Sequence, residues 1–154
     1  MSEKEKRARE LFRSGYNCAQ SVFCTFCDET GMKFDDALKL SSSFGGGMGR
    51  LREVCGAVSA MFMIAGILYG YTSPNNDEIK GQHYTLIQEL AEKFKQKYDT
   101  IICRELLGLE EKQDSPIPSK RTQEYYENRP CENFIGFAAQ IIEEMIEQKQ
   151  KLDF

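Results

Sequence analysis

Residues 54–71 contain no charged side chain, although 29% of the residues in the chain are charged. A stretch of this length and composition fits either a short membrane-spanning helix or a helix at the centre of a bundle. Its glycines and serine suit close helix packing, and the amphipathic segments around it need an apolar core to cover. We therefore expect a central apolar helix over residues 51–71, and we do not expect an integral membrane protein.

Apolar residues recur at helical spacing along most of the remaining chain. This pattern predicts further helices over residues 5–13, 17–31, 35–43, 76–98, 100–107, 119–127 and 131–151. The proline-containing segment 108–119 is predicted to be a loop, and no segment has the alternation typical of a strand. The sequence therefore predicts an all-α fold, a single-domain helical bundle over residues 1–154.

The formal net charge is −4, and no basic stripe offsets it. This balance argues against a nucleic-acid partner, because such proteins neutralise phosphates with a basic surface. The N-terminal residues are charged and lack the apolar core of a secretory signal, so we expect a cytoplasmic location. In a reducing compartment, 6 cysteines point to redox chemistry, metal binding or burial rather than to a permanent disulfide scaffold.

Four of the cysteines are predicted to lie at or near the start of a helix. They are Cys18, Cys55, Cys103 and Cys131. The N-terminus of a helix and nearby guanidinium groups both favour a thiolate over a thiol. Cys55 follows Arg50 and Arg52, so Cys55 is predicted to be the reactive thiolate.

Two other cysteines and the single histidine are predicted to have no catalytic role. Cys24 and Cys27 fall in the middle of the predicted helix 17–31, with Cys27 facing away from Cys18, and are interpreted as packing residues. His83 lies on a mostly polar helix and is interpreted as a surface residue. A hydrolase with a cysteine–histidine pair is therefore not expected.

A cluster of glycines over residues 45–49 precedes the apolar helix. Its spacing matches neither the phosphate-binding loop of nucleotide hydrolases nor the dinucleotide fingerprint. Most of these glycines are therefore predicted to form a sharp turn between helices, in which the backbone needs positive φ angles.

With these residues in view, the chain resembles the C_GCAxxG_C_C family, small proteins named for four cysteines and a Cys-Gly-Ala-x-x-Gly motif. The resemblance rests on Asn17-Cys18-Ala19-Gln20, on the glycines 45–49 with Cys55-Gly56-Ala57, on Cys103-Arg-Glu-Leu106 and on Cys131. Ala60 stands where the family has its last glycine, so a close contact there must tolerate a methyl group. The resemblance implies redox activity, and the genes of the family are often described beside transporter genes.

The leading hypothesis is a thiol–disulfide oxidoreductase in which Cys55 attacks and Cys18, Cys103 or Cys131 resolves. One alternative is a metal or iron–sulfur site formed by the same four cysteines. Another is a non-catalytic accessory protein associated with a transporter. The sequence leaves open the cofactor, the redox partner, the cysteine pairing and the oligomeric state.

Overall fold

Helices form the framework of the chain in the computed structural model, which describes residues 1–110 and 113–152. They are α1 (Glu3–Arg13), α2 (Cys18–Thr25), α3 (Cys27–Thr30), α4 (Phe34–Ser41), the 3-10 helix η1 (Ser42–Phe44), α5 (Gly45–Met48), α6 (Gly56–Tyr69), α7 (Asp77–Tyr98), α8 (Cys103–Leu106), α9 (Gln123–Asn128) and α10 (Cys131–Leu152). No strand occurs within the described residues, where a single isolated bridge joins Val54 and Ile102. The all-α prediction is confirmed.

Several helices begin at side chains that cap their free N–H groups. Asn17 forms a capping box at the start of α2, where its side chain accepts from Gln20 and the Gln20 side chain accepts from the Asn17 N–H. At the starts of α1 and α7, the side chains of Ser2 and Asn76 each accept one backbone N–H, from Glu5 and from Ile79. A cap side chain accepts hydrogen bonds that the first turn of a helix cannot satisfy internally, so these residues fix where each helix starts.

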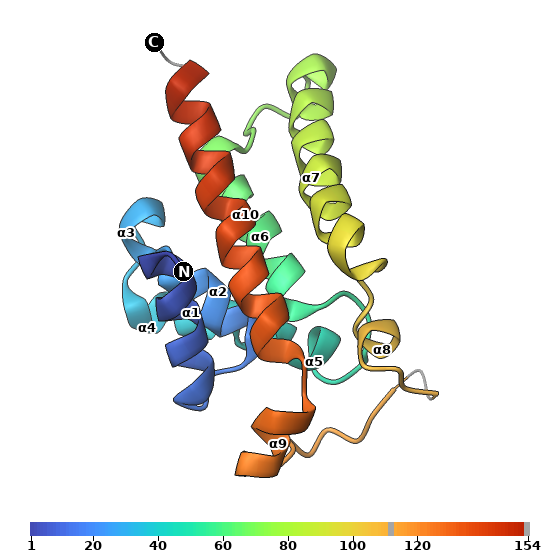
Figure 1. Ribbon diagram of the computed structural model, residues 1–154. Helices are drawn as coiled ribbons and strands as arrows, with labels where there is room; N and C mark the ends of the chain where they lie inside the picture. Colours follow the sequence, from blue (N-terminus) through green and yellow to red (C-terminus); the bar gives the residue numbers. More distant parts are fainter. Residues whose placement is uncertain (111–112, 153–154) are drawn as a thin grey trace.

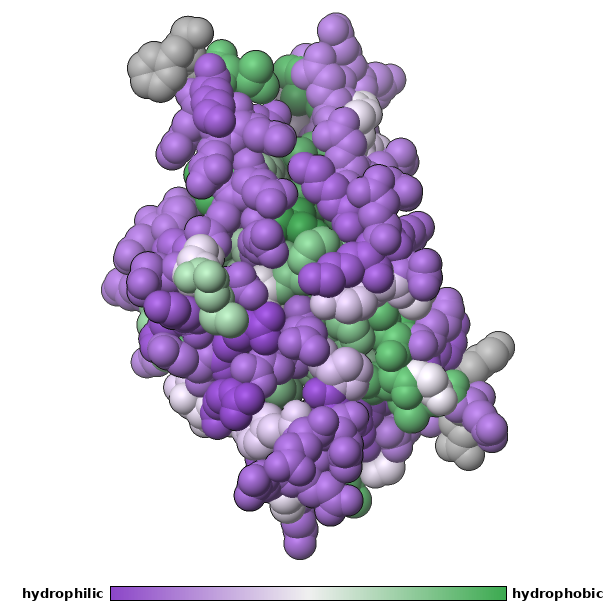
Figure 2. Space-filling model, in the orientation of Figure 1, coloured by the Kyte–Doolittle hydropathy of each residue, from purple (hydrophilic) through white to green (hydrophobic). Residues whose placement is uncertain are grey.

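The apolar helix α6 packs against α2, α7 and α10, while α1 lies along α10 and α2 (Figure 1). Phe23, Met61, Phe94 and Ile142 from these helices are completely buried. Hydrophilic residues cover most of the face drawn in Figure 2, and apolar residues show in the seam between α10 and α7. None of the helices in the described part of the chain has the length and apolar character needed to cross a membrane.

The apolar helix starts at Gly56, later than the predicted start at residue 51. Arg50 and Arg52 have φ angles of 67° and 59°, which an α-helix does not allow. The intervening loop instead pairs with the segment before α8, since the Cys55 N–H donates to the Ile101 carbonyl at 2.8 Å. The prediction of a continuous helix was wrong there because the backbone of two arginines takes a left-handed conformation.

Other predicted boundaries also needed correction. The predicted helix 17–31 is broken at Phe26, whose φ and ψ of −106° and 26° separate α2 from α3. The predicted helices 100–107 and 119–127 are shorter, and residues 119–122 belong to the preceding loop. The part of the predicted loop at residues 111 and 112 lies outside the described residues. The predicted turn at the glycines is confirmed, because Gly46, Gly47 and Gly49 all have positive φ angles.

Candidate functional site

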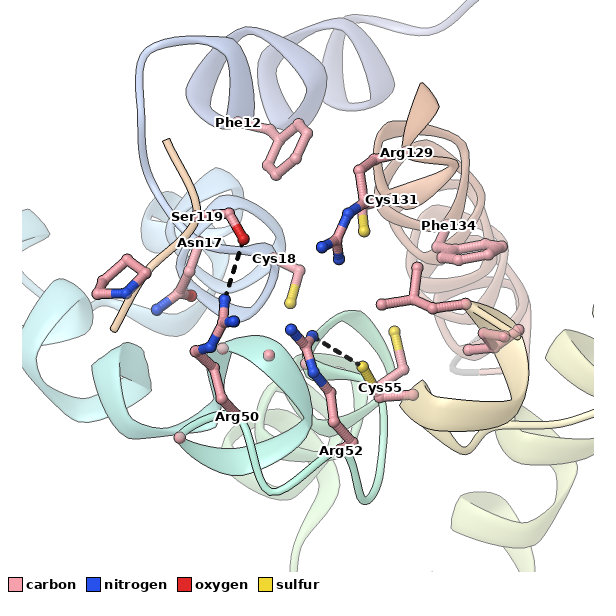
Figure 3. A pocket seen from close by; sticks show the side chains of 18 of the residues that line it. Phe12, Asn17, Cys18, Arg50, Arg52, Cys55, Ser119, Arg129, Cys131 and Phe134 are labelled. Carbon is pink, nitrogen blue, oxygen red and sulfur yellow. Dashed lines mark hydrogen bonds between the residues drawn. The ribbon is translucent and has the colours of Figure 1, made fainter. Parts of the chain in front are cut away.

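A cavity of about 260 Å³ lies where four segments of the bundle meet (Figure 3). Its lining includes Cys18, Cys55, Cys103 and Cys131. Cys18, Cys103 and Cys131 are the first residues of α2, α8 and α10, and Cys55 directly precedes α6. The structure thus brings the four predicted site cysteines together at the ends of four helices, while their chemical role stays a prediction.

Gly56 allows the start of α6 to lie directly against Cys18. A Cβ atom at residue 56 would lie 2.5 Å from the Cys18 Sγ and 2.7 Å from the Phe44 carbonyl oxygen. The backbone N–H groups of Gly46, Ala19 and Gly56 act to lower the pKa of Cys18, against the larger effect of burial. The Cys-Gly step of the sequence therefore serves to position Cys18, since only a residue without a side chain leaves room for its sulfur.

Arg52 contacts a cysteine of the cavity, but that cysteine is Cys103 and not the predicted Cys55. Its side chain is 4% exposed, and its Nη1 donates to the Cys103 Sγ at 3.5 Å. Its Nη2 donates to the Asp114 carboxylate at 3.0 Å, and Arg50 pairs with the same oxygen at 3.1 Å. The Asp114 carboxylate in turn has its pKa lowered, first by the Arg52 hydrogen bond.

Burial governs the protonation of three of the four thiols. It raises the pKa of Cys55 well above the ordinary value, the pKa of Cys131 to about 12, and the pKa of Cys18. The N–H groups of Ala57 and Val58 at the start of α6 act in the opposite direction on Cys55, but burial outweighs them. Burial therefore acts against the Cys55 thiolate that the helix start was predicted to favour, and the role of Cys55 stays a prediction.

Among the cavity thiols, Cys18 has the strongest influence on the pKa of Cys55 and of Cys131. After burial, the largest influence on the pKa of Cys55 and of Cys131 is the charge of Cys18, which raises both. The charge of Cys103 likewise raises the pKa of Cys18. Because one thiolate makes a second less favourable, ionisation of one of these thiols disfavours ionisation of the next.

The raised pKa of Cys131 predicts an unusual pH dependence for its alkylation by iodoacetamide. Since only the thiolate reacts, the rate should rise about tenfold for each pH unit between about pH 7 and pH 10, without levelling off. In the urea-unfolded protein, the alkylation rate of Cys131 should instead level off near the ordinary cysteine pKa of 9.0. Peptide mass spectrometry measures both rates, and a plateau below pH 9 in the folded protein would contradict the burial argument.

Cys24 and Cys27 do not line this cavity among the described residues. Cys24 is buried in α2, and burial raises its pKa to about 12. Cys27 is the first residue of α3, so its predicted place in the middle of a helix was wrong. His83 is half-buried against Tyr71 rather than on the surface as predicted, and its Nδ1 is buried without a hydrogen-bond partner in the described part of the chain.

Two arginines that the sequence analysis did not identify also line the cavity. Arg121 stacks over the Phe12 ring at 4.4 Å and donates to the Phe12 and Tyr16 carbonyls. Arg129 lies over the Tyr125 ring at 5.3 Å. Neither arginine belongs to a recognisable sequence motif. Their one sequence signal is that they lie shortly before Cys131, in a segment interpreted as a loop and a short helix.

The metal or iron–sulfur alternative stays a prediction, and the described residues add one observation to it. Within residues 1–110 and 113–152, no three His, Cys, Asp or Glu side chains are grouped so that they could hold a metal ion. A structural zinc or iron–sulfur site needs such a group of deprotonated ligands.

The fold and the cavity together define a class: small all-α proteins with a buried pocket lined by cysteines. The chain belongs to the C_GCAxxG_C_C family, described as "Putative redox-active protein", which it matches over residues 16–145. The comparisons with curated proteins and with solved structures gave no match. Ala60, at the position where the family motif ends in glycine, is completely buried and belongs to the apolar core.

Proposed function

We propose that the protein carries out thiol–disulfide exchange in this cavity, with Cys18, Cys55, Cys103 and Cys131 as the reacting thiols. The observation that supports this most is that four thiols from distant parts of the sequence line a single cavity. The family description as redox-active agrees with this chemistry. The same site accounts for Gly56, where a Cβ would meet the Cys18 sulfur, and for Gly47, where a Cβ would meet the Cys103 Cβ.

We assign the first attack to Cys103, because the Arg52 guanidinium donates to its sulfur. A guanidinium is a donor that stabilises a thiolate, which is the nucleophile in this reaction. Cys55 was the predicted attacking residue, but burial raises the pKa of its thiol and so disfavours the thiolate. Cys55 and Cys131 are therefore not assigned to the first step.

In the proposed reaction, the Cys103 thiolate attacks one sulfur of a small disulfide substrate. An S–S bond forms between Cys103 and that sulfur, while the other substrate sulfur leaves as a thiolate and takes up a proton. Cys18 then loses its proton and attacks the Cys103 sulfur, which releases the second substrate thiol and leaves a Cys18–Cys103 disulfide. Two electrons pass from the protein to the substrate, and an external dithiol returns them with two protons.

The proposal is tested by treating the reduced protein with 2-hydroxyethyl disulfide and mapping alkylated and disulfide-linked peptides by mass spectrometry. We expect a disulfide between Cys18 and Cys103, and we expect Cys103→Ser to abolish the mixed disulfide that precedes it. Cys24→Ser is the matched control, because it removes a thiol outside the cavity lining, and it should leave this reaction unchanged. Four free cavity thiols after oxidation would overturn the proposal.

A further inference from the structure

Arginines supply the charged side chains of the cavity. They are Arg50, Arg52, Arg121 and Arg129. The described residues of the lining include no aspartate, glutamate, lysine or histidine. Asp114 is the carboxylate that accepts from Arg50 and Arg52, whereas Arg121 donates to backbone carbonyls. The cavity is therefore positive in a protein whose net charge is −4, so overall composition does not explain its charge.

Two of these arginines have a backbone conformation that is energetically unfavourable. Arg50 and Arg52 both have left-handed φ angles, at 67° and 59°. For a residue other than glycine, this conformation costs on the order of 1–3 kcal/mol and is found most often at binding and active sites. Figure 3 shows both side chains extending from this loop toward the cavity, on either side of Cys18.

Arg52 also has a hydrogen-bond donor without a partner. The residue is 3% exposed, and its Nε is buried with no acceptor among the described residues. An unsatisfied buried donor costs about 1–3 kcal/mol, and an oxygen atom of a ligand would remove this cost. In Figure 3 the guanidinium groups of Arg52 and Arg129 approach the centre of the cavity from opposite sides.

Helix ends add to the positive potential. The N-termini of α2, α6 and α10 all meet the cavity, at Cys18, Gly56 and Cys131. The free N–H groups at a helix start carry partial positive charge and favour anions. The guanidinium groups and the helix ends therefore act in the same direction.

We infer that the cavity binds a small anion, and that the substrate of the proposed exchange is a low-molecular-weight disulfide bearing acidic groups such as carboxylates. The identity of the substrate as a disulfide rests on the proposed function, whereas anion binding rests on the arginines and the helix starts. The reacting sulfurs would lie beside the cysteines while the acidic groups lie against the guanidinium groups, which bind planar oxyanions well.

Three disulfides with different charges test this inference. We would measure the rate at which each oxidises the reduced protein and divide it by the rate of the same disulfide with free 2-mercaptoethanol, which removes intrinsic reactivity. The anionic 3,3′-dithiodipropionate should react at least about tenfold faster than neutral 2-hydroxyethyl disulfide, and cationic cystamine should be the slowest. The difference should shrink as salt is added, because salt screens charge.

Two cavity variants and one control show whether the arginines cause the preference. Arg129→Gln should reduce the preference for the anionic disulfide several-fold, whereas Asp114→Asn should increase it by removing the carboxylate that competes for Arg50 and Arg52. Lys149→Gln removes one positive charge from α10, far from the cavity lining, and should have no effect. If Asp114→Asn instead lowers the preference, the carboxylate assists binding and the inference is wrong.

A ligand that cannot take part in redox chemistry tests this inference separately from the proposed function. Suberate has the length and carboxylates of 3,3′-dithiodipropionate but no sulfur, and calorimetry should detect its binding, while neutral 1,8-octanediol should not bind. If 2-hydroxyethyl disulfide oxidises the cavity thiols but suberate does not bind and charge has no effect on rate, this inference fails and the proposed function stands. If suberate binds but none of the disulfides oxidises the thiols, the proposed function fails and only the anion site remains.

Discussion

Replacing Gly47 with alanine is expected to lower the free energy of unfolding by about 2–5 kcal/mol. Gly47 has a φ of 68°, which disfavours any residue with a Cβ. The added Cβ would lie 2.6 Å from the Cys103 Cβ and 2.8 Å from both the Arg52 Cα and the Glu53 N. Two of these three are backbone atoms, and the Glu53 N–H already donates to the Gly47 carbonyl at 2.9 Å, so no side-chain rotation relieves the contact.

Urea unfolding of the reduced Gly47→Ala protein measures this loss of stability. Gly66→Ala is the matched control, because a Cβ at Gly66 in α6 would meet no atom within 4 Å. That control should be neutral or stabilising by up to about 1 kcal/mol, since alanine costs less backbone entropy than glycine in a helix. Equal stability of the two variants would show that the turn accommodates a side chain, and would contradict the packing described for Gly47.

The fold could be predicted largely from local signals. The amphipathic pattern of residues 76–98 and 131–151 extends over many turns, and α7 and α10 follow it closely. Asn17 and Asn76 are capping residues, and α2 and α7 begin directly after them. Short helices were less predictable, because α8 and α9 depend on tertiary contacts more than on their own propensity.

The helix-start positions of the cysteines could be predicted, but their meeting at one cavity could not be derived from spacing. It depends on the loop between α5 and α6, where Arg50 and Arg52 adopt positive φ angles. Such angles are expected for glycine and are uncommon for arginine, so nothing local in the sequence predicted this loop conformation. Arg121 and Arg129 enter the cavity through long-range packing, for which the sequence has no local signal.

The protonation of Cys55 shows why electrostatic reasoning from sequence fails at a buried site. The sequence places two arginines and a helix start beside this residue, and both favour a thiolate. In the fold, Arg52 instead contacts Cys103, and Cys55 is 5% exposed. The effect of desolvation on the pKa of Cys55 then dominates, because removing a charge from water costs more free energy than the helix start contributes to stabilising the thiolate. Burial can be judged only once the surrounding helices are placed.

Arg52→Gln is expected to slow the reaction of Cys103 with iodoacetamide and with disulfides by at least about tenfold, the effect of about 1.4 kcal/mol on the thiolate. Glutamine is neutral, so the charge that stabilises a Cys103 thiolate is lost with the Nη1 contact. Arg52→Lys keeps the charge but loses the planar guanidinium, whose two separate nitrogens donate to Cys103 and to Asp114. An intermediate rate for lysine would separate the effect of charge from that of geometry.

Arg104→Gln is the control for this change, because Arg104 directly follows Cys103 and its side chain donates to Glu53 and to the Arg52 carbonyl instead of a cysteine. Its rate should stay within about twofold of the original protein, since a partly exposed charge has a small effect. Rates are compared after circular dichroism shows that each variant is folded. If folded Arg52→Gln reacts as fast as Arg104→Gln, Arg52 does not activate Cys103, and the first attack must be assigned to another of the four thiols.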